Sequence, residues 1–285
     1  MEALATWLKR NLWAAFLAHQ AGLAIIAIVF LSLVKRITFR TIHFLRDPIG
    51  LGDGTALVVL SIAVILLTRV FYLWIKGGEA PPLGIAVTPR RFLDLVVGLL
   101  TGFVFTIAPW VSALWRGTAS IHDRITNHFD SFSVARILTV AFFMLLLQGL
   151  MEETTNRAFP MRLWEHRSLA FRMIVPSIFF VAIHMVSEPF SFERTGVLFM
   201  AGLQLSIAYA LTGNVWLASG VHTGANLAGF SIGGLWHAGA VVALVGRPSI
   251  PYWAVTMIML AVFSAMFALT RLYRAKLPAA QIGAG

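Results

Sequence analysis

Two adjacent glutamates and an arginine are the first residues in this chain that could do chemistry: Glu152, Glu153 and Arg157. They follow a long apolar run with only Gly149 as a weak break, so we expect the helix of that run to continue through them. Glu153 and Arg157 are four residues apart and can pair on one helix face, whereas Glu152 points about 100° away. The pattern fits a carboxylate general base. The alternative is an acidic pair at a helix end among the lipid headgroups.

Two further pairs of residues place polar groups inside apolar runs. Phe180 and His184 share a helix face, and so do His222 and Asn226, because the members of each pair are four residues apart. Taken singly, each pair has a structural explanation. A histidine can be satisfied by a helix-packing hydrogen bond, and a His–Asn pair can join helices.

Glycines accompany the second of these pairs. Gly220 and Gly224, and then Gly229 and Gly233, are spaced by four residues. Small residues at this spacing let a second helix approach closely within a membrane. The sequence therefore predicts a tight helix contact beside His222.

Considered together, the three groups have complementary chemistry. A glutamate can deprotonate water, a histidine can orient it or carry protons, and a His–Asn pair can donate to an oxyanion. This set indicates a hydrolase in which water is the nucleophile. Zinc is the alternative, because Glu152, His184 and His222 are ligand types that it accepts. No HExxH helix is present, so a site without a metal or other cofactor is favoured.

The elements that carry these residues are long apolar runs. About 20 apolar residues span the hydrocarbon core of a bilayer. The first run is too long for a signal peptide. The apolar piece Leu235–Val245 is too short to span the membrane, so we expect this piece to extend the seventh helix or to re-enter the membrane. His19, inside the first run, is interpreted as a packing histidine. The eight runs are Leu12–Val34, Ala56–Ile75, Phe92–Trp115, Val134–Leu150, Ala170–Ser187, Thr195–Leu211, Val215–Ile232 and Pro251–Leu269.

The composition agrees with a lipid bilayer as the main partner of the chain. Of its 285 residues, 59% are hydrophobic and only 12% are charged, and the mean hydropathy is +0.82. A soluble enzyme, a disordered chain and a coiled coil are excluded on these values. The net charge of +10 is spread over short connections, which indicates membrane-flanking charge and no nucleic-acid partner. The absence of cysteine excludes disulfides and thiol nucleophiles.

The predicted fold class is all-α, a polytopic membrane helix bundle of about eight transmembrane helices. Lys and Arg are slightly more frequent on the side that both termini share. By the positive-inside rule, this predicts a multi-pass protein of the cell (inner) membrane with both termini cytoplasmic. The basic segment 35–46 is either an interfacial amphipathic helix or a plain loop.

The three motifs together resemble those of the CAAX protease and bacteriocin-processing (CPBP, or Abi) family, to which the type II CAAX prenyl endopeptidase is distantly similar. The family motifs EExxxR, FxxxH and HxxxN/D all occur in this chain, in order. The resemblance covers roughly residues 134–235. It implies N-terminal helices in residues 1–130, a catalytic core in residues 131–250, and a last helix with a short basic tail in residues 251–285.

The resemblance implies an intramembrane glutamic endopeptidase that acts near the membrane surface on a peptide or membrane-protein substrate. In this scheme Glu152 activates water, His184 assists, and His222 and Asn226 stabilise the oxyanion. Competing functions are a non-catalytic scaffold or bacteriocin-immunity protein and a proton-coupled transporter.

The same resemblance assigns supporting roles to three residues. Glu153 and Arg157 orient the site, and Phe180 shapes the pocket.

Overall fold

Each of the eight predicted runs forms a helix in the computed structural model, which describes residues 2–38, 51–77, 80–127, 130–187, 190–232 and 242–275. Five stretches of the described chain are long and apolar enough to cross a membrane. With 81% of the structure helical, the predicted helical membrane bundle is confirmed. The eight helices are α2 (Leu12–Thr38), α3 (Leu51–Lys76), α4 (Pro89–Trp115), α5 (Ser131–Glu153), α7 (Leu169–Ser187), α8 (Phe192–Thr212), α9 (Trp216–Ile232) and α10 (Tyr252–Ala275).

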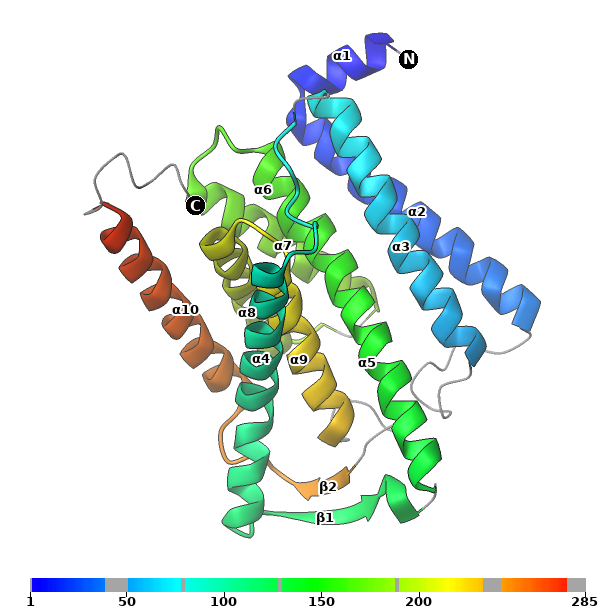
Figure 1. Ribbon diagram of the computed structural model, residues 1–285, viewed down its shortest axis with the longest axis vertical. Helices are drawn as coiled ribbons and strands as arrows, with labels where there is room; N and C mark the ends of the chain where they lie inside the picture. Colours follow the sequence, from blue (N-terminus) through cyan, green and yellow to red (C-terminus); the bar gives the residue numbers. More distant parts are fainter. Residues whose placement is uncertain are drawn as a thin grey trace.

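The helices are arranged around α9. Helices α2 and α3 run side by side along one flank, α10 lies on the opposite flank, and α4, α5, α8 and α9 lie between them (Figure 1). A short helix, α1 (Glu2–Arg10), precedes α2 at one end of the bundle.

The other end of the bundle carries a small sheet that the sequence did not predict. Strand β1 (Ala119–Arg124), followed by the short helix η1 (Ile125–Asn127), pairs antiparallel with β2 (Val242–Gly246). Part of the segment Leu235–Val245 is therefore a strand and does not continue α9, because its Val-rich end finds a partner strand in β1. Residues 233–241, like residues 39–46 of the basic segment, lie outside the described residues.

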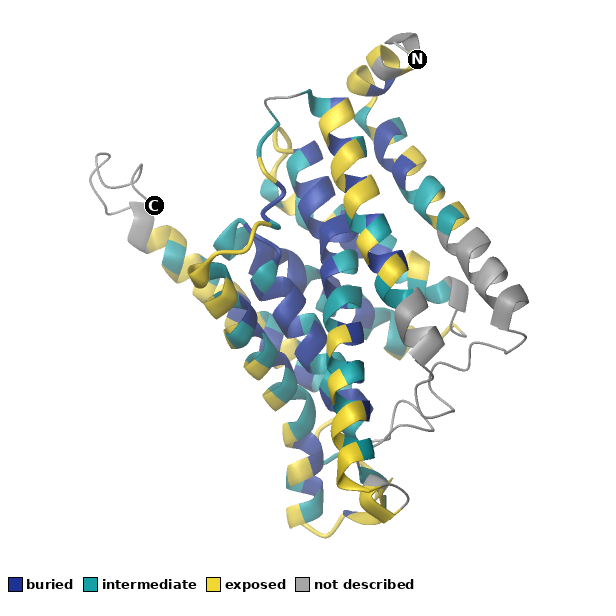
Figure 2. Ribbon diagram, turned by 45° about the vertical axis from the view of Figure 1, so that its right-hand side comes forward, coloured by how far each residue is buried: buried dark blue, intermediate teal, exposed yellow. Residues whose placement is uncertain are grey.

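The outer surface of the bundle carries many large apolar side chains, and its interior is partly polar. Figure 2 shows how buried and exposed residues are distributed over the helices. Large side chains such as Leu66 and Val70 of α3 and Leu100 and Val104 of α4 are exposed. In a bilayer these side chains face lipid, while polar groups must be satisfied inside the protein. Buried polar residues accordingly occur on α3, α7, α8 and α9: Ser61, Thr68, Ser177, Gln204, Ser206, Ser219 and Thr223.

Glycines bring α4 and α9 into the most extensive helix contact of the bundle. Gly98 and Gly102 of α4 face Gly220 and Gly224 of α9. A Cβ at Gly102 would lie 2.1 Å from the carbonyl oxygen of Val221, and one at Gly224 would lie 2.2 Å from that of Leu99. The close approach predicted from Gly220 and Gly224 is confirmed, with α4 as the partner.

A similar contact joins α5 to α9. A Cβ at Gly149 would lie 2.6 Å from Oγ1 of Thr223, and the Thr223 hydroxyl donates to the carbonyl of Leu145 at 3.3 Å. Gly149 does not break the helix, since α5 continues to Glu153 as expected. This contact fixes the end of α5 against the helix that carries His222.

Helix α2 is held against the bundle by aromatic and polar contacts. The ring of Phe16 packs on those of Phe159 and Trp164, at centroid distances of 6.4 and 4.8 Å. His19 is buried, and its Nε2 lies 3.0 Å from Oγ1 of Thr68 on α3. His19 is therefore a packing residue, as expected.

Candidate active site

The acidic pair lies where α5 changes its helical pitch. After Glu153 the chain forms a π-helical turn, η2 (Thr154–Ala158), and then the short helix α6 (Phe159–Leu163). The amide of Phe159 donates to the carbonyl of Thr154, five residues earlier. Pro160 has no N–H to continue this pattern, and the carbonyl of Thr155 instead accepts from Gln20 of α2 at 3.5 Å. Single π-turns within α-helices are frequent at functional sites.

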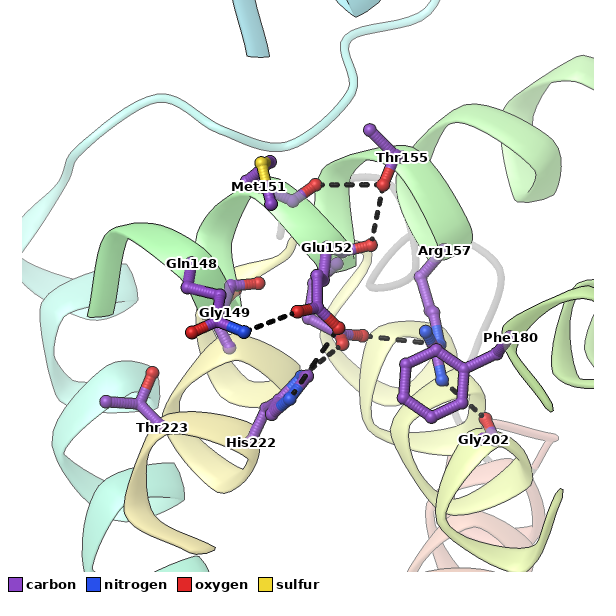
Figure 3. A network of polar contacts seen from close by, with 12 residues as sticks. Gln148, Gly149, Met151, Glu152, Thr155, Arg157, Phe180, Gly202, His222 and Thr223 are labelled. Atoms are coloured by element: carbon purple, nitrogen blue, oxygen red, sulfur yellow. Dashed lines mark hydrogen bonds and ion pairs between the residues drawn. The ribbon is translucent and has the colours of Figure 1, made fainter. Parts of the chain in front are cut away.

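Glu153 and Arg157 form a fully buried ion pair. Arg157 Nε lies 3.3 Å from Oε2 of Glu153, and both side chains are 0% exposed (Figure 3). The guanidinium also donates from Nη2 to the carbonyl of Gly202 at 3.5 Å and lies 4.3 Å from the ring centroid of Phe180. The predicted i,i+4 pair is therefore present, and the Phe180 face adds a cation–π contact.

His222 connects the two glutamates. Its Nδ1 lies 2.9 Å from Oε1 of Glu153, and its Nε2 lies 3.8 Å from Oε2 of Glu152 (Figure 3). A carboxylate paired with Arg157 only accepts hydrogen bonds, so Nδ1 of His222 carries the hydrogen. The opposite nitrogen, Nε2, therefore faces Glu152.

Glu152 faces away from the buried ion pair, as its position on the helix predicted. Its side chain is 16% exposed, whereas that of Glu153 is 0% exposed. One turn earlier, Gln148 donates from Nε2 to Oε1 of Glu152 at 2.9 Å (Figure 3). This bond holds Oε1 of Glu152 in place, and Oε2 faces His222.

The second motif links the other two through aromatic contacts. The Phe180 ring lies 4.4 Å from that of His184 and 6.1 Å from that of His222, centroid to centroid. His184 Nδ1 lies 2.8 Å from the carbonyl oxygen of Phe180. Since a carbonyl can only accept, Nδ1 of His184 carries the hydrogen.

Two cavities meet at these residues. One of about 480 Å³, which we name the α2–α3 chamber, is bounded by α2, α3, α5, η2, α7, α8 and α9 and includes Leu60, Val64, Glu152 and Asn156. The other, of about 360 Å³, is named the α8–α10 chamber and is bounded by α4, α7, α8, α9 and α10. The walls of both chambers include Phe180, His184, Arg194, His222 and Asn226.

All seven residues selected from the sequence are thus brought together. Five of them line a chamber, and Glu153 and Arg157 form the buried pair behind it. Sequence reasoning missed Gln148, Asn156 and Arg194, which also line the chambers. Gln148 and Asn156 each lie four residues from Glu152, and this spacing is the signal that could have found them.

The described side chains of the site are not grouped as a zinc site. Zinc requires three protein ligands at about 2.0–2.2 Å from one ion. Within the part of the chain that the structure describes, no three His, Asp or Glu side chains are grouped in that way.

A protein-family model agrees with the resemblance seen in the motifs. Residues 134–228, which are 95 of the 285 residues, match the family model of the type II CAAX prenyl endopeptidase Rce1-like proteins. The matched segment runs from α5 into α9 and contains all seven site residues. No curated protein and no solved structure shows significant similarity to the chain.

Proposed function

We propose, from the premise that residues 134–228 match the Rce1-like family of CAAX-type intramembrane proteases, that this chain is an intramembrane endopeptidase with Glu152 as its general base. One observation carries the proposal. Glu152 lines a chamber with one oxygen held by Gln148 and the other 3.8 Å from His222 Nε2, while the adjacent Glu153 is locked in a buried ion pair.

The reaction begins with a water molecule bound against Oε2 of Glu152. As Glu152 takes its proton, the water oxygen forms a bond to the carbonyl carbon of the peptide, and the carbonyl electron pair moves onto its oxygen. The tetrahedral intermediate collapses when the C–N bond breaks. Glu152 returns the proton to the departing amine nitrogen, so the enzyme leaves the cycle unchanged.

His222 and Asn226 are the donors for the developing oxyanion. They are one helical turn apart on α9, and both line the two chambers. An imidazolium at His222 donates from Nδ1 to Glu153 and from Nε2 to the oxyanion. Asn226 supplies its amide N–H from the next turn.

The remaining motif residues hold this arrangement. His184, whose Nδ1 is committed to the carbonyl of Phe180, directs Nε2 to orient the water. Glu153 and Arg157 fix the ring of His222, and Phe180 supports Arg157.

The proposed substrate is a peptide or membrane-protein segment that lies through both chambers. Because the walls of both include the same five residues, the bond to be cut would sit where the chambers meet. The protein acts from within a cell (inner) membrane, with both termini on the cytoplasmic side.

The test uses purified protein in detergent with a quenched-fluorescent peptide library. We expect cleavage by the parent, unchanged by chelator, and a loss of about 10²–10⁴-fold in Glu152→Gln. Glu165→Gln is the matched control, since Glu165 pairs with Lys76 at the surface.

Equal cleavage by the parent and Glu152→Gln would contradict the assignment of the base. Loss on chelation with rescue by zinc would establish a metalloprotease. If the parent cleaves neither a peptide of the library nor a membrane-protein substrate reconstituted with it, this result would favour a non-catalytic scaffold.

A further inference from the structure

We infer that Asn156 is an additional substrate-binding residue, whose side-chain amide hydrogen-bonds the peptide backbone of the substrate beside the bond to be cut. The inference rests on the proposed function, since it places a peptide in the α2–α3 chamber. It adds a residue outside the three motifs and a recognised group, the uncharged backbone amide.

The first observation is an unused polar group. Asn156 is only 6% exposed, and its Oδ1 has no hydrogen-bond partner among the described residues. A buried amide in this state destabilises a fold unless a ligand or water supplies the missing bond. Thr155, the other residue of η2 in the chamber wall, differs, because its hydroxyl donates to the carbonyls of Met151 and Glu152.

The second observation is the position of this amide. Asn156 lines the same chamber as Glu152 and lies four residues after it, just as Gln148 lies four residues before it. Gln148 donates its side-chain N–H to Glu152. Asn156 lies at the same spacing on the other side of Glu152, in the π-turn, and its Oδ1 has no partner among the described residues.

The spacing suits an extended peptide. One helical turn advances about 5.4 Å, and an extended chain advances about 3.3 Å per residue. An amide one turn from Glu152 therefore reaches a backbone group one or two residues from the scissile bond. A peptide that enters this chamber exchanges bulk water for protein around its backbone, so each protein amide that meets it contributes to binding.

An uncharged backbone group matches this side chain better than a charged one. An amide both donates and accepts, as a peptide group does, so two hydrogen bonds can form in one plane. Selectivity for backbone geometry, with no requirement for a particular side chain at that position, follows from this chemistry.

The experiment compares Asn156→Leu with the parent on a cleaved peptide and on analogues in which one flanking backbone amide at a time is an ester. We expect Asn156→Leu to lower kcat/KM about ten-fold for the all-amide peptide, mainly through KM. One ester analogue should be cleaved equally poorly by both proteins, because the ester removes the same hydrogen bond.

Thermal unfolding separates this role from a structural one. Replacing an unpaired buried amide by leucine should leave Tm unchanged or raise it. Asn214→Leu is the matched control, because Asn214 is a buried amide whose partners, Asp94 and the amide of Trp216, lie within the protein. It should lower Tm and leave the amide-to-ester preference as in the parent.

A second arm does not depend on cleavage. The same peptides, carrying biotin and a diazirine, are photo-crosslinked to Glu152→Gln with and without Asn156→Leu. Cleavage that does not depend on Glu152, with peptide capture still sensitive to Asn156, would contradict the proposed function alone. Three results would overturn the inference. The first is an equal amide-to-ester preference with and without Asn156, and the second is a fall in Tm for Asn156→Leu together with a uniform loss of cleavage on all analogues. The third is that no peptide is captured at all.

Discussion

Glu152 and Glu153 are neighbours in the chain, yet their carboxylates lie in different surroundings. Glu153 is enclosed with Arg157 and His222, and Glu152 faces a chamber beside Gln148. The turn of about 100° between consecutive helical residues separates them. The buried pair sets the orientation of His222, so it determines which nitrogen of that ring is left for chemistry.

Breaking the buried pair should destabilise the protein strongly. Arg157→Met leaves Glu153 buried without its cation, and we expect the free energy of unfolding to fall by about 3–5 kcal/mol. The double variant Glu153→Gln, Arg157→Met should recover much of this loss but not the activity, because His222 loses the negative charge of its carboxylate partner. Denaturation in detergent measures the free energy of unfolding of the single and the double variant, and peptide cleavage measures their activity. A single variant as stable as the parent would contradict the pairing.

Gln148 should affect activity with little effect on stability. Gln148→Leu removes the hydrogen bond to Glu152 Oε1, and a bond to a charged group contributes about 1.5–3 kcal/mol, so kcat should fall by at least about ten-fold. The control is Thr139→Val on the exposed side of the same helix. Unchanged kcat in Gln148→Leu would show that this bond does not position the base.

At the scale of elements, the helices that carry the candidate site are placed by small residues. Gly149 lets α5 contact α9, and four glycines let α4 contact the opposite side of α9. Helices in a bilayer gain little from hydrophobicity against each other, so close packing of small residues decides where they meet. Helix α4 lies outside the matched segment 134–228, yet it fixes the position of α9.

A single methyl group should disturb this contact. Gly102→Ala places a Cβ 2.1 Å from the carbonyl oxygen of Val221, so α4 must move away and the free energy of unfolding should fall by about 1–3 kcal/mol. Gly22→Ala on α2 is the matched control, because nothing lies within 4 Å of its Cβ, and it should be neutral or stabilising. Equal melting temperatures for the two variants would contradict the packing.

At the scale of the whole molecule, the N-terminal helices complete the site. Leu60 and Val64 of α3, with Gln20, Leu23 and Ala24 of α2, form one wall of the α2–α3 chamber. These residues precede the matched segment, so the family resemblance alone does not describe this wall. We expect it to influence which peptides fit.

Narrowing each chamber should change selectivity on one side of the scissile bond only. Val64→Phe should lower cleavage of peptides with bulky residues on one side about ten-fold or more, and Ala201→Phe should do so on the other side. Val70→Phe, exposed on the outer face of α3, is the control. Mass spectrometry of a cleaved library reads out both sides. The same change from both chamber variants would exclude a substrate path through both chambers.

Much of this architecture was predictable from the sequence. The eight apolar runs coincide with helices because burial in lipid requires about 20 apolar residues with every backbone group bonded internally. The Glu153–Arg157 pair and the tight contact at Gly220 and Gly224 were predicted from four-residue spacings. The β1–β2 pairing was not, since its strands are far apart in the chain and their pairing leaves no local period.

The sequence by itself determined which polar residues lie within the apolar runs and which face of each helix they share, because helical periodicity is a local property. Only the tertiary structure decided that Phe180 contacts residues of all three motifs and that His222 lies between the two glutamates. Distances between helices depend on side-chain volumes at their contacts, above all on the glycines of α4, α5 and α9. Those volumes act between segments far apart in the chain, so no local pattern reports them.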